Sequence, residues 1–419
     1  MIDVLVIGGG PAGAVVALRL AQLGLAVRLM ERSTFPRPHV GESLSPGVWV
    51  HFATLGVADR VLHAGFRMSR QTLLRWRGQT ERIVSERPSL IVDRGRFDAL
   101  MLGAARDAGV DVRQPCAASA HDLGEARFVV DASGRSGFTR RTRRPVAPRT
   151  IAWHARWPDA GGQSVTRVER IDATWLWGTT LPDGTFSAMA FGSGEEPMAS
   201  MLRRSELFNW LGDPIDPPRA ADATPYVCDD PIDMRSAAVG EAAFAIDPIS
   251  SSGVQAAMAS GIAAAAAINT ILRRPADASA AIRFYAAHVA RTSERHAAWA
   301  ADSYAAAPPK TAEPIAIDDG ALFAANTTAV VTAPAIRGDF IELVAAVRTR
   351  FGDDVAFLED TALAPLLASL ASPTPARRIV DDWSRTMPPS RAAAVLTWLV
   401  EQQVLIPQYP RPTTADSRE

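Results

Sequence analysis

Ile2-Asp3-Val4-Leu5-Val6-Ile7 runs directly into Gly8-Gly9-Gly10-Pro11-Ala12-Gly13, and this stretch decides the fold. The apolar run predicts a buried strand, the glycines predict a tight turn, and the Ala/Leu-rich residues after them predict a helix. Gly8 can adopt the positive φ of the turn, Gly10 lets the backbone approach a diphosphate, and Gly13 lets the helix lie close to the strand. Because the helix N-terminus then directs bare N–H groups at the turn, the stretch predicts a phosphate-binding βαβ unit.

A second apolar run, Leu25 to Met30, predicts the strand that closes this unit. It ends at Glu31, about 20 residues beyond the glycines, where a carboxylate can accept hydrogen bonds from an adenosine ribose. Strand, glycine turn, helix, strand and terminal acid in this order indicate a dinucleotide-binding fold.

Composition and charge bound the rest of the chain. The 419 residues can form two or three domains, and the net charge of −1 indicates no global attraction to nucleic acid or to an anionic membrane. Cys116 and Cys228 lack the spacing of a disulfide framework or a metal site, so we expect buried thiols and no metal. The chain starts at its first strand without an apolar leader, which predicts a cytoplasmic protein. The Ala-rich run 261–268 predicts a core helix rather than a membrane span.

The order of the predicted elements favours an α/β fold: a Rossmann-like domain in three pieces, with an inserted mixed β-sheet domain and a small, mainly helical C-terminal domain. The pieces of the first domain are 1–68, 93–150 and 231–305, and those of the sheet domain are 69–92 and 151–230. Residues 306–320 contain three prolines and predict a linker. In the C-terminal domain (321–410) we expect helices over 340–351, 363–370, 376–385 and 390–402. This pattern is similar to a winged-helix module that recognises peptides, and a helical cap or an oligomer contact stays open as an alternative.

Several polar stretches outside the glycine turn predict further parts of the same site. Arg94 opens a helix directly after Asp93, a residue type that caps helices. Asp131 and Gly134 end an apolar run and offer a second place where backbone can meet phosphate. The stretch from Asp247 through the serines to Ser252 precedes a long helix that we expect from about residue 253 to 273.

Taken together, these motifs resemble the p-hydroxybenzoate hydroxylase-like flavoproteins, and more narrowly their flavin-dependent halogenase branch. The resemblance covers residues 1–300 and is most specific in Gly41-Glu42-Ser43-Leu44 and in the stretch from Asp247 to Val254. It implies FAD as the cofactor, O₂ as co-substrate, and NAD(P)H or a separate flavin reductase as the source of electrons. The cofactor-binding residues that it implies are Gly8, Gly10, Ala12, Gly13, Glu31, Arg32, Arg37, Gly41, Ser43, Arg94, Asp131, Gly134, Glu241, Asp247, Gly253 and Val254.

The resemblance also implies which part of FAD each of these residues contacts. Glu31 would hold the adenosine ribose, Arg37 and Arg94 would lie beside the diphosphate and ribityl chain, and the Gly41–Ser43 segment would border the isoalloxazine. The helix that starts near Gly253 would direct a partial positive charge at the flavin and favour its anionic reduced form.

One departure from the family concerns the ribitol. The family's usual Gly-Asp pair is Gly240-Glu241 here, so either Glu241 reaches the ribitol with one extra methylene or another group does so. Asp247 would bind the diphosphate or the ribityl side.

A second departure concerns the chemistry. Halogenases of this branch use a lysine to relay hypohalous acid, and alignment of Gly65-Phe66 and Arg75-Trp76 with their pattern places Ser69 at that position. The single lysine of the sequence is Lys310, in the predicted linker. The resemblance therefore implies oxygenation, in which reduced flavin and O₂ give a C4a-hydroperoxide that attacks an electron-rich aromatic ring. Catalytic residues are unknown at this stage, no histidine stands out by spacing, and the candidates for the flavin face are Glu42, Ser43, Ser69 and Ser252.

Within the branch, the chain most resembles the monooxygenases that hydroxylate a tryptophan of a precursor protein during tryptophylquinone cofactor biogenesis. This implies a peptide or protein substrate that docks through the substrate domain and the C-terminal domain. Two alternatives stay open: an aromatic hydroxylase or halogenase of small molecules, and a non-catalytic scaffold that keeps FAD. Trp175-Leu176-Trp177 echoes the Trp-x-Trp motif of halogenases but lacks their following Ile-Pro, so we interpret it as aromatic packing between the sheet and flavin domains.

Overall fold

The computed structural model describes residues 2–76, 78–158, 165–305 and 317–408. The chain forms two compact units, Met1–Pro309 and Lys310–Glu419, which are described separately. Most of the predicted linker (306–316), with Lys310, lies outside the described residues.

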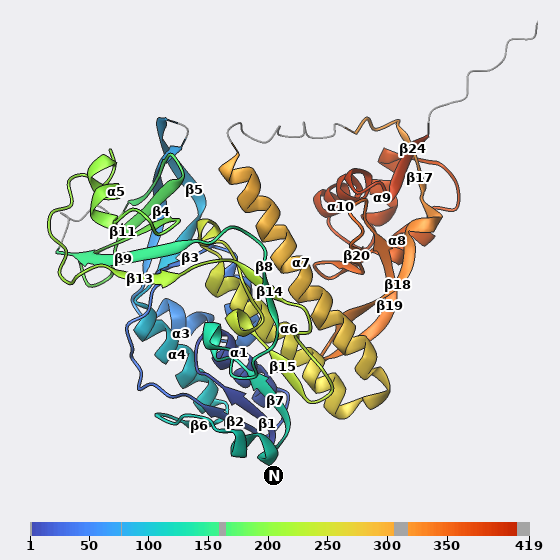
Figure 1. Cartoon of the computed structure of the whole chain (residues 1–419). Helices are drawn as coiled ribbons and strands as arrows, with labels where there is room; N and C mark the ends of the chain where they lie inside the picture. Colours follow the sequence, from blue (N-terminus) through green and yellow to red (C-terminus); the bar gives the residue numbers. More distant parts are fainter. Residues whose placement is uncertain (1, 77, 159–164, 306–316, 409–419) are drawn as a thin grey trace, which may run out of the picture. The chain divides into compact units, whose positions relative to one another are not determined.

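A five-stranded parallel sheet forms the base of the first unit (Figure 1). Its strand order is β15-β7-β1-β2-β6, so the first two strands of the sequence lie side by side, as the βαβ prediction requires. The central strand is buried, with Val4 and Val6 both 0% exposed. The strands are β1 (Ile2–Ile7), β2 (Val27–Met30), β6 (Asp111–Arg113), β7 (Ala126–Asp131) and β15 (Ser236–Ala238).

Helices pack around this parallel sheet and against one another. A Cβ on Gly261 of α6 would lie 2.9 Å from the carbonyl oxygen of Ala12 in α1, so the absence of a side chain lets the two helices cross closely. By length and composition α6 could cross a membrane, but 78% of its most apolar window is buried inside the fold, as a core helix requires. The helices of this unit are α1 (Pro11–Gln22), α2 (Val48–Leu55), α3 (Ala58–Leu62), α4 (Arg94–Asp107), α5 (Met198–Arg204), α6 (Gly253–Arg273) and α7 (Ala278–Tyr304).

An eight-stranded mixed sheet forms the second layer of this unit, in the order β13-β9-β12-β11-β10-β4-β5-β3. Only β10 and β4 pair in parallel among these neighbours. The strands are β3 (Ser43–Leu44), β4 (Arg67–Trp76), β5 (Gln79–Ile91), β9 (Ile151–Trp157), β10 (Thr166–Ile171), β11 (Thr174–Thr180), β12 (Phe186–Gly192) and β13 (Arg219–Asp222). A smaller sheet contains β8 (Arg143–Pro145), β14 (Tyr226–Cys228) and β16 (Phe244–Ala245).

The two faces of the mixed sheet are buried in different ways. One face carries an apolar cluster that includes Leu176 and Phe186, and α5 covers it. On the other face Trp175 and Trp177 pack with Met189 and Phe191. Ile249 and Tyr304, from the part of the chain predicted to complete the flavin domain, pack against this second cluster. The interpretation of the Trp-x-Trp stretch as packing between the two domains is therefore confirmed.

The second unit contains more strand than the sequence predicts. Residues 340–351 were expected to be helical, but Phe340–Arg348 is strand β19, paired with β18 (Val330–Arg337). The prediction was wrong because Gly338, at φ +58°, and Asp339 form a two-residue hairpin turn, and β-branched residues in the run favour the pleated sheet. The remaining elements are α8 (Leu363–Ala368), α9 (Ala376–Trp383), α10 (Pro389–Glu401), β17 (Leu322–Ala325), β20 (Asp354–Val355), β21 (Phe357–Leu358), β22 (Thr361–Ala362), β23 (Thr374–Pro375) and β24 (Leu405–Gln408).

The helices of the second unit share one apolar core. Leu363, Ile379, Trp383 and Leu399 are buried in it together, so the helical predictions over 363–370, 376–385 and 390–402 are confirmed.

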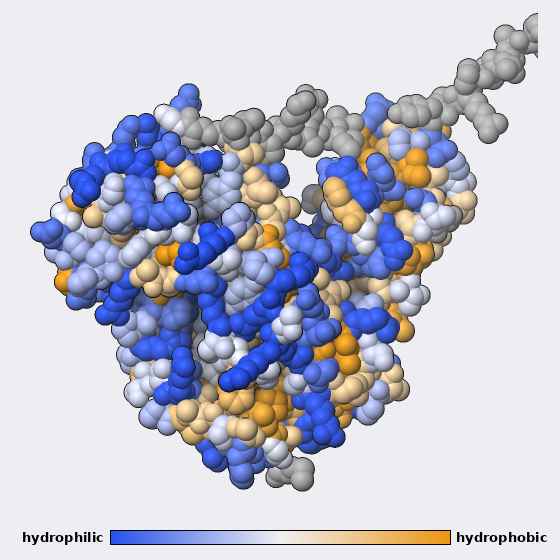
Figure 2. All heavy atoms as spheres, viewed as in Figure 1, coloured by the Kyte–Doolittle hydropathy of each residue, from blue (hydrophilic) through white to orange (hydrophobic). Residues whose placement is uncertain are grey.

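Hydrophilic residues cover most of the face drawn in Figure 2, with hydrophobic residues in separate patches.

Candidate active site

The glycine turn between β1 and α1 has the geometry that its sequence predicts. Gly8 has a φ of +108°, and a Cβ on Gly13 would lie 1.9 Å from the carbonyl oxygen of Gly8, so both positions require glycine. At Gly10 the space is open: the nearest atom to an added Cβ would be Nη2 of Arg37, 3.9 Å away. The first turn of α1 has neither a side-chain cap nor an acidic residue. Bare N–H groups and a guanidinium therefore face the same space, as a diphosphate requires.

Glu31 follows β2 at the same edge of the sheet. Its side chain is buried, and its two carboxylate oxygens accept hydrogen bonds from the backbone N–H of Gly9 (2.6 Å) and of Ser33 (2.7 Å). Each carboxylate oxygen can accept a second bond, so Glu31 retains the capacity to hold a ribose diol. Arg32, the next predicted residue, is exposed.

Arg94 anchors the loop that carries the Gly-Glu-Ser-Leu motif. Its guanidinium donates to both carboxylate oxygens of Asp98 (3.0 and 3.2 Å) and to the carbonyl oxygen of Val40 (2.7 Å). Both members of this pair are buried, and Nη2 of Arg37 lies 3.6 Å from Asp98. Gly41, at φ +95°, leaves no room for a side chain, because a Cβ there would lie 2.9 Å from Nη1 of Arg94. In this structure Arg94 positions the loop, and its predicted contact with FAD stays a prediction.

Asp131, at the end of β7, organises the loop that follows it. One carboxylate oxygen accepts from the N–H and hydroxyl of Ser133, and the other from the N–H and hydroxyl of Thr139. Four donors occupy the lone pairs of this buried carboxylate, so the structure assigns Asp131 a role in loop geometry. Gly134, at φ +69°, belongs to the same loop.

Glu241 reaches this group from another element. It lies in the short helix Gly240–Ala242, its side chain is half-exposed, and its Oε1 lies 3.4 Å from Nε of Arg135. A Cβ on Gly240 would lie 2.7 Å from Cβ of Ala12, which places this segment against the start of α1. The predicted residues of the glycine turn, the Gly134 loop and the Glu241 segment therefore come together around one helix N-terminus.

Asp247 and the start of α6 form a second group. Asp247 accepts from the N–H of Ile249 (2.9 Å) and from the hydroxyl of Tyr304 (3.0 Å), and burial raises the pKa of its carboxyl group. Ser251 has a φ of +48°, and α6 starts at Gly253 with no side-chain cap and no acidic residue in its first turn. Gln255 of α6 bonds Ser45, which ties the helix to the residue that follows β3 (Ser43–Leu44). Val254, the last predicted residue, is buried.

Ser69 lies at the position where the halogenase resemblance implies a relay lysine. It sits on β4, 6% exposed, and its Oγ lies 3.3 Å from Oγ1 of Thr166, which in turn lies 3.4 Å from Oγ1 of Thr179. The next strand places Ser187 directly opposite Thr179. Hydroxyl groups thus occupy one row across four strands of the mixed sheet.

At the end of this row lies the one predicted catalytic candidate that is completely buried, Glu42. Its Oε1 accepts from the hydroxyl of Ser187 (3.1 Å) and lies 3.6 Å from Nε2 of His154, and its Oε2 accepts from the N–H of Gly41 (2.9 Å). Burial alone would raise the pKa of Glu42, but the hydrogen bond and charge of His154, with the backbone and Ser187 bonds, outweigh burial and lower it. A completely buried carboxylate from the flavin side and a partly exposed imidazole from the sheet therefore form a pair.

Sequence reasoning missed His154 and Ser187. Both lie on the face of the sheet that carries Trp177 and Met189, because β9 and β12 pair with His154 opposite Met189. The available signal was the alternation Trp153, His154, Ala155, which puts the histidine on the face opposite its apolar neighbours. The sequence does not say that Glu42 lies on the same side.

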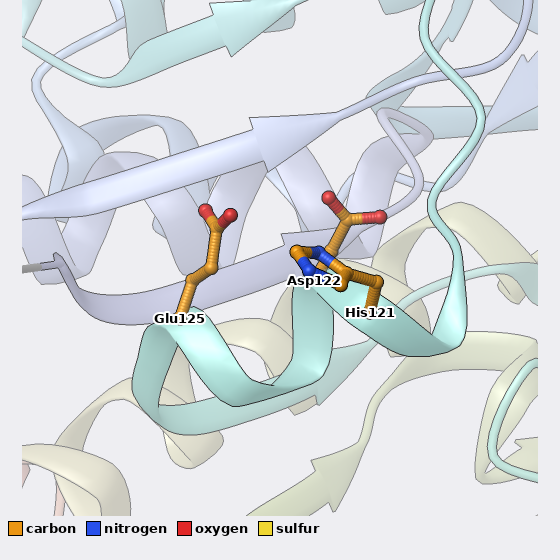
Figure 3. Close-up of side chains that lie close together, drawn as sticks. All are labelled: His121, Asp122 and Glu125. Carbon is orange, nitrogen blue, oxygen red and sulfur yellow. The ribbon is translucent and has the colours of Figure 1, made fainter.

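His121, Asp122 and Glu125 also lie close together, with ligand atoms within 4.8 Å of one another (Figure 3). One carboxylate oxygen of each acid already has a partner, since Oδ2 of Asp122 accepts from the N–H and hydroxyl of Ser119, and Oε2 of Glu125 accepts from Arg28. A hollow of about 460 Å³ beside Glu125 and Arg28 lies at the start of β1 and β7. In open α/β sheets ligands bind at the opposite, carboxyl ends of the strands, so this region is not the candidate site.

Comparison with known proteins adds to this geometry. Residues 1–142 match the family of FAD-binding domains. The chain is 31% identical over 334 residues to a tryptophan 2-halogenase of Chondromyces crocatus, an alignment that covers 67% of this chain and 64% of the halogenase. The chain thus spans slightly less than two thirds of the length of that relative.

Two solved structures share the fold over almost the whole chain. CmlS, a flavin-dependent halogenase, has a TM-score of 0.78 at 19% identity and covers 97% of this chain and 96% of its own. The peptidyl tryptophan dihydroxylase QhpG, essential for tryptophylquinone cofactor biogenesis, has a TM-score of 0.69 at 24% identity and covers 96% of this chain and 99% of its own. At these identities the two structures establish the fold.

Proposed function

From the FAD-binding domain over residues 1–142 and the 31% identity to a tryptophan 2-halogenase, we propose that this chain is an FAD-dependent monooxygenase that hydroxylates an electron-rich aromatic ring. The proposed substrate is a tryptophan side chain in a peptide or protein precursor, modified on the way to a tryptophylquinone cofactor. Ser69 carries the proposal, because the halogenase resemblance calls for a relay lysine at this position and the structure has a buried hydroxyl there.

The residues present fit FAD. The Gly8–Gly13 turn with Arg37 would hold the diphosphate, Glu31 would hold the adenosine ribose, and the uncapped N-terminus of α6 would complement negative charge on a reduced flavin. When bound and reduced, the flavin supplies the activation of O₂. The chain contributes the dry surroundings: Trp175 and Trp177, both nearly buried, pack beside Ile249 of the loop that leads to α6.

The choice of a peptide substrate rests on the shared fold. QhpG, a peptidyl tryptophan dihydroxylase, matches this chain over both units. We propose that the mixed sheet and the C-terminal unit both take part in docking the precursor, and that NAD(P)H or a separate reductase supplies the electrons.

Halogenation or hydroxylation of a small aromatic molecule is the second candidate, and the 31% identity to a tryptophan 2-halogenase favours it. One experiment separates the candidates. The FAD-loaded protein is incubated with NADH, a flavin reductase and ¹⁸O₂, with either free tryptophan or tryptophan-containing peptides, in the presence and absence of chloride and bromide. Mass spectrometry then reports what was added.

Incorporation of ¹⁸O into a peptide, independent of halide, is the expected result. A halide-dependent mass increase, or full activity on free tryptophan, would replace the proposal by the second candidate. Peptide binding without any change in mass would leave only the alternative of an FAD-containing scaffold.

A further inference from the structure

Glu42, Ser187 and His154 come from three different segments and form one hydrogen-bonded group that the function proposed above leaves without a role. Glu42 lies on the loop between β2 and β3, Ser187 on β12 and His154 on β9. The carboxylate is 0% exposed, so the structure carries the cost of a buried charge here. A charge kept at that cost beside an imidazole is characteristic of sites where protons move.

The contacts of His154 fix the direction in which it can act. Its Nε2 lies 3.3 Å from Oγ of Ser187 and 3.6 Å from Oε1 of Glu42. Among the described residues no partner lies on Nδ1, and the side chain is 21% exposed although Glu42 is completely buried. With Nε2–H directed at Glu42, the tautomer leaves a lone pair on Nδ1, the arrangement of a carboxylate-oriented base.

Apolar side chains lie on the same face of the sheet as this base. Met189 lies directly opposite His154, and Trp177 lies directly opposite Met189 on the next strand. In the adjacent row Trp175 stacks on Phe191, with ring centroids 4.0 Å apart and planes 12° apart. We call Trp175, Trp177, Met189 and Phe191 the aromatic wall; these side chains are buried, and an apolar surface of this kind suits an aromatic ring beside it.

The other charges that face His154 come from the neighbouring strands. Arg219 lies opposite it on β13, and Arg156 lies two residues along β9, with Nη1 3.9 Å from Asp183. Among the described residues Glu42 is the only acid paired with His154, so it is the group that compensates a positive imidazole.

We propose that His154 is the proton acceptor for an aromatic substrate that already carries a ring hydroxyl, with Glu42 and Ser187 as its positioning residues. The phenolic O–H gives its proton to Nδ1, which leaves a phenolate and an imidazolium, and Nε2–H of the imidazolium is held by the Glu42 carboxylate. The O–H bond breaks with its electron pair left on oxygen, the lone pair of Nδ1 forms the new N–H bond, and no atom changes its oxidation state. A phenolate is a better nucleophile than a phenol, so the pair accelerates oxygenation of a hydroxylated ring.

This inference rests on the proposed function and specifies its substrate. Removal of the base would slow a second oxygenation, on a ring that has already received one hydroxyl, more than the first. A histidine base contributes about 10²- to 10⁴-fold to such a step.

The first test measures ionisation without turnover. The oxidised, FAD-loaded protein is mixed with 3-fluorophenol at about pH 7, roughly three units below the pKa of an ordinary phenol, and ¹⁹F NMR reports whether the bound probe is a phenol or a phenolate. We expect the wild-type protein and the control His121→Gln, an exposed histidine, to bind the phenolate, and His154→Gln to bind the neutral phenol. The substitution Glu42→Gln changes a completely buried side chain and can affect folding, so the main test is His154→Gln and Glu42→Gln is a supporting variant. Neutral phenol on the wild type, or no binding at millimolar probe, would overturn the inference.

The second test measures turnover on a matched pair of substrates, peptides with tryptophan or with 5-hydroxytryptophan. His154→Gln should lose about 100-fold or more of the rate on the hydroxylated ring and less than tenfold on tryptophan, so that a singly oxygenated product accumulates. Equal losses on both rings would refute the role of His154. If the wild-type protein oxygenates neither peptide, the proposed function fails, while the NMR result still decides on the base.

Discussion

Asp98→Asn tests whether the buried Arg94–Asp98 pair holds the cofactor loop. Asp98 is 0% exposed and Arg94 5% exposed, and the two join through hydrogen bonds of 3.0 and 3.2 Å. The substitution keeps the shape of the side chain but removes its charge, and therefore leaves the guanidinium of Arg94 buried without a counter-ion. Breaking a buried pair in this way costs about 3–5 kcal/mol.

The assay is thermal unfolding of the FAD-free protein, followed by circular dichroism. At roughly 2 °C per kcal/mol for a domain of this size, the expected fall in Tm is about 6–10 °C. Arg94 also donates to the carbonyl oxygen of Val40, so the loop should loosen and the affinity for FAD should fall together with Tm.

A matched control lies on the same helix. Asp107 pairs with Arg60 at the end of α4, but both side chains are largely exposed. Asp107→Asn should therefore change the free energy of unfolding by less than about 1 kcal/mol. Equal effects of the two substitutions would refute the argument that burial makes the Arg94–Asp98 pair important.

Three further predictions concern the glycine turn, Glu42 and the aromatic wall. Gly13→Ala should abolish co-purification of flavin, seen as loss of visible absorbance, because the new Cβ would lie 1.9 Å from the carbonyl oxygen of Gly8, whereas Gly124→Ala, with nothing within 4 Å, should bind flavin normally. Glu42→Gln should be less stable than wild type in urea above pH 4.5, and the difference should disappear on acidification, because a lowered folded-state pKa gives stability that is complete above the unfolded pKa and lost as pH falls through the folded one. A pH-independent difference would contradict the assignment. Trp175→Leu should cost about 3 kcal/mol of unfolding free energy by loss of burial and of its stacked partner, and a change below 1 kcal/mol would contradict the packing described.

The parts of the fold that short stretches determine were predicted correctly. The positive φ of Gly8 and the close approach at Gly13 follow from neighbours within one turn, so the motif contains its own structural reason. The helix expected near residue 253 starts at Gly253 for a similar reason, since Asp247 and the serines before it form the polar turn that precedes a helix.

Roles that depend on which donors surround an acid could not be predicted in this way. Asp131 at a strand end has the sequence signature of a cofactor ligand, but Ser133 and Thr139 occupy its carboxylate. The sequence fits both roles of Asp131, as a cofactor ligand or as the acceptor of hydrogen bonds within its own loop. Only the conformation of the loop distinguishes the two roles. The helix expected over 340–351 failed for a related reason: the hairpin turn before it decides the structure of the run.

The contacts of His154 and Ser187 with Glu42 could not be predicted from the sequence, because they depend on strand register. Glu42 is 145 residues from Ser187, and a shift of one residue in the pairing of β9 with β12 would turn His154 to the opposite face. Register is a property of the whole sheet, and no local motif encodes it.

The same register places side chains of the mixed sheet in contact with the flavin domain, the other half of the first unit. Around the aromatic wall the flavin domain and the mixed sheet are joined by several bonds: Ser187 to Glu42, Trp76 to the carbonyl oxygen of Ser303, and Arg170 to that of Tyr304. Tyr304 also donates to Asp247, so the end of α7 links the sheet to the loop that starts α6. Productive oxygen transfer requires reacting atoms to be held to within a fraction of an ångström. Strands of the sheet carry His154 and the aromatic side chains, and the bonded loops carry the predicted flavin contacts. A displacement of either half would therefore break the bond between Ser187 and Glu42. On the proposed function, loss of the Glu42–His154 pair should therefore uncouple O₂ consumption from product formation.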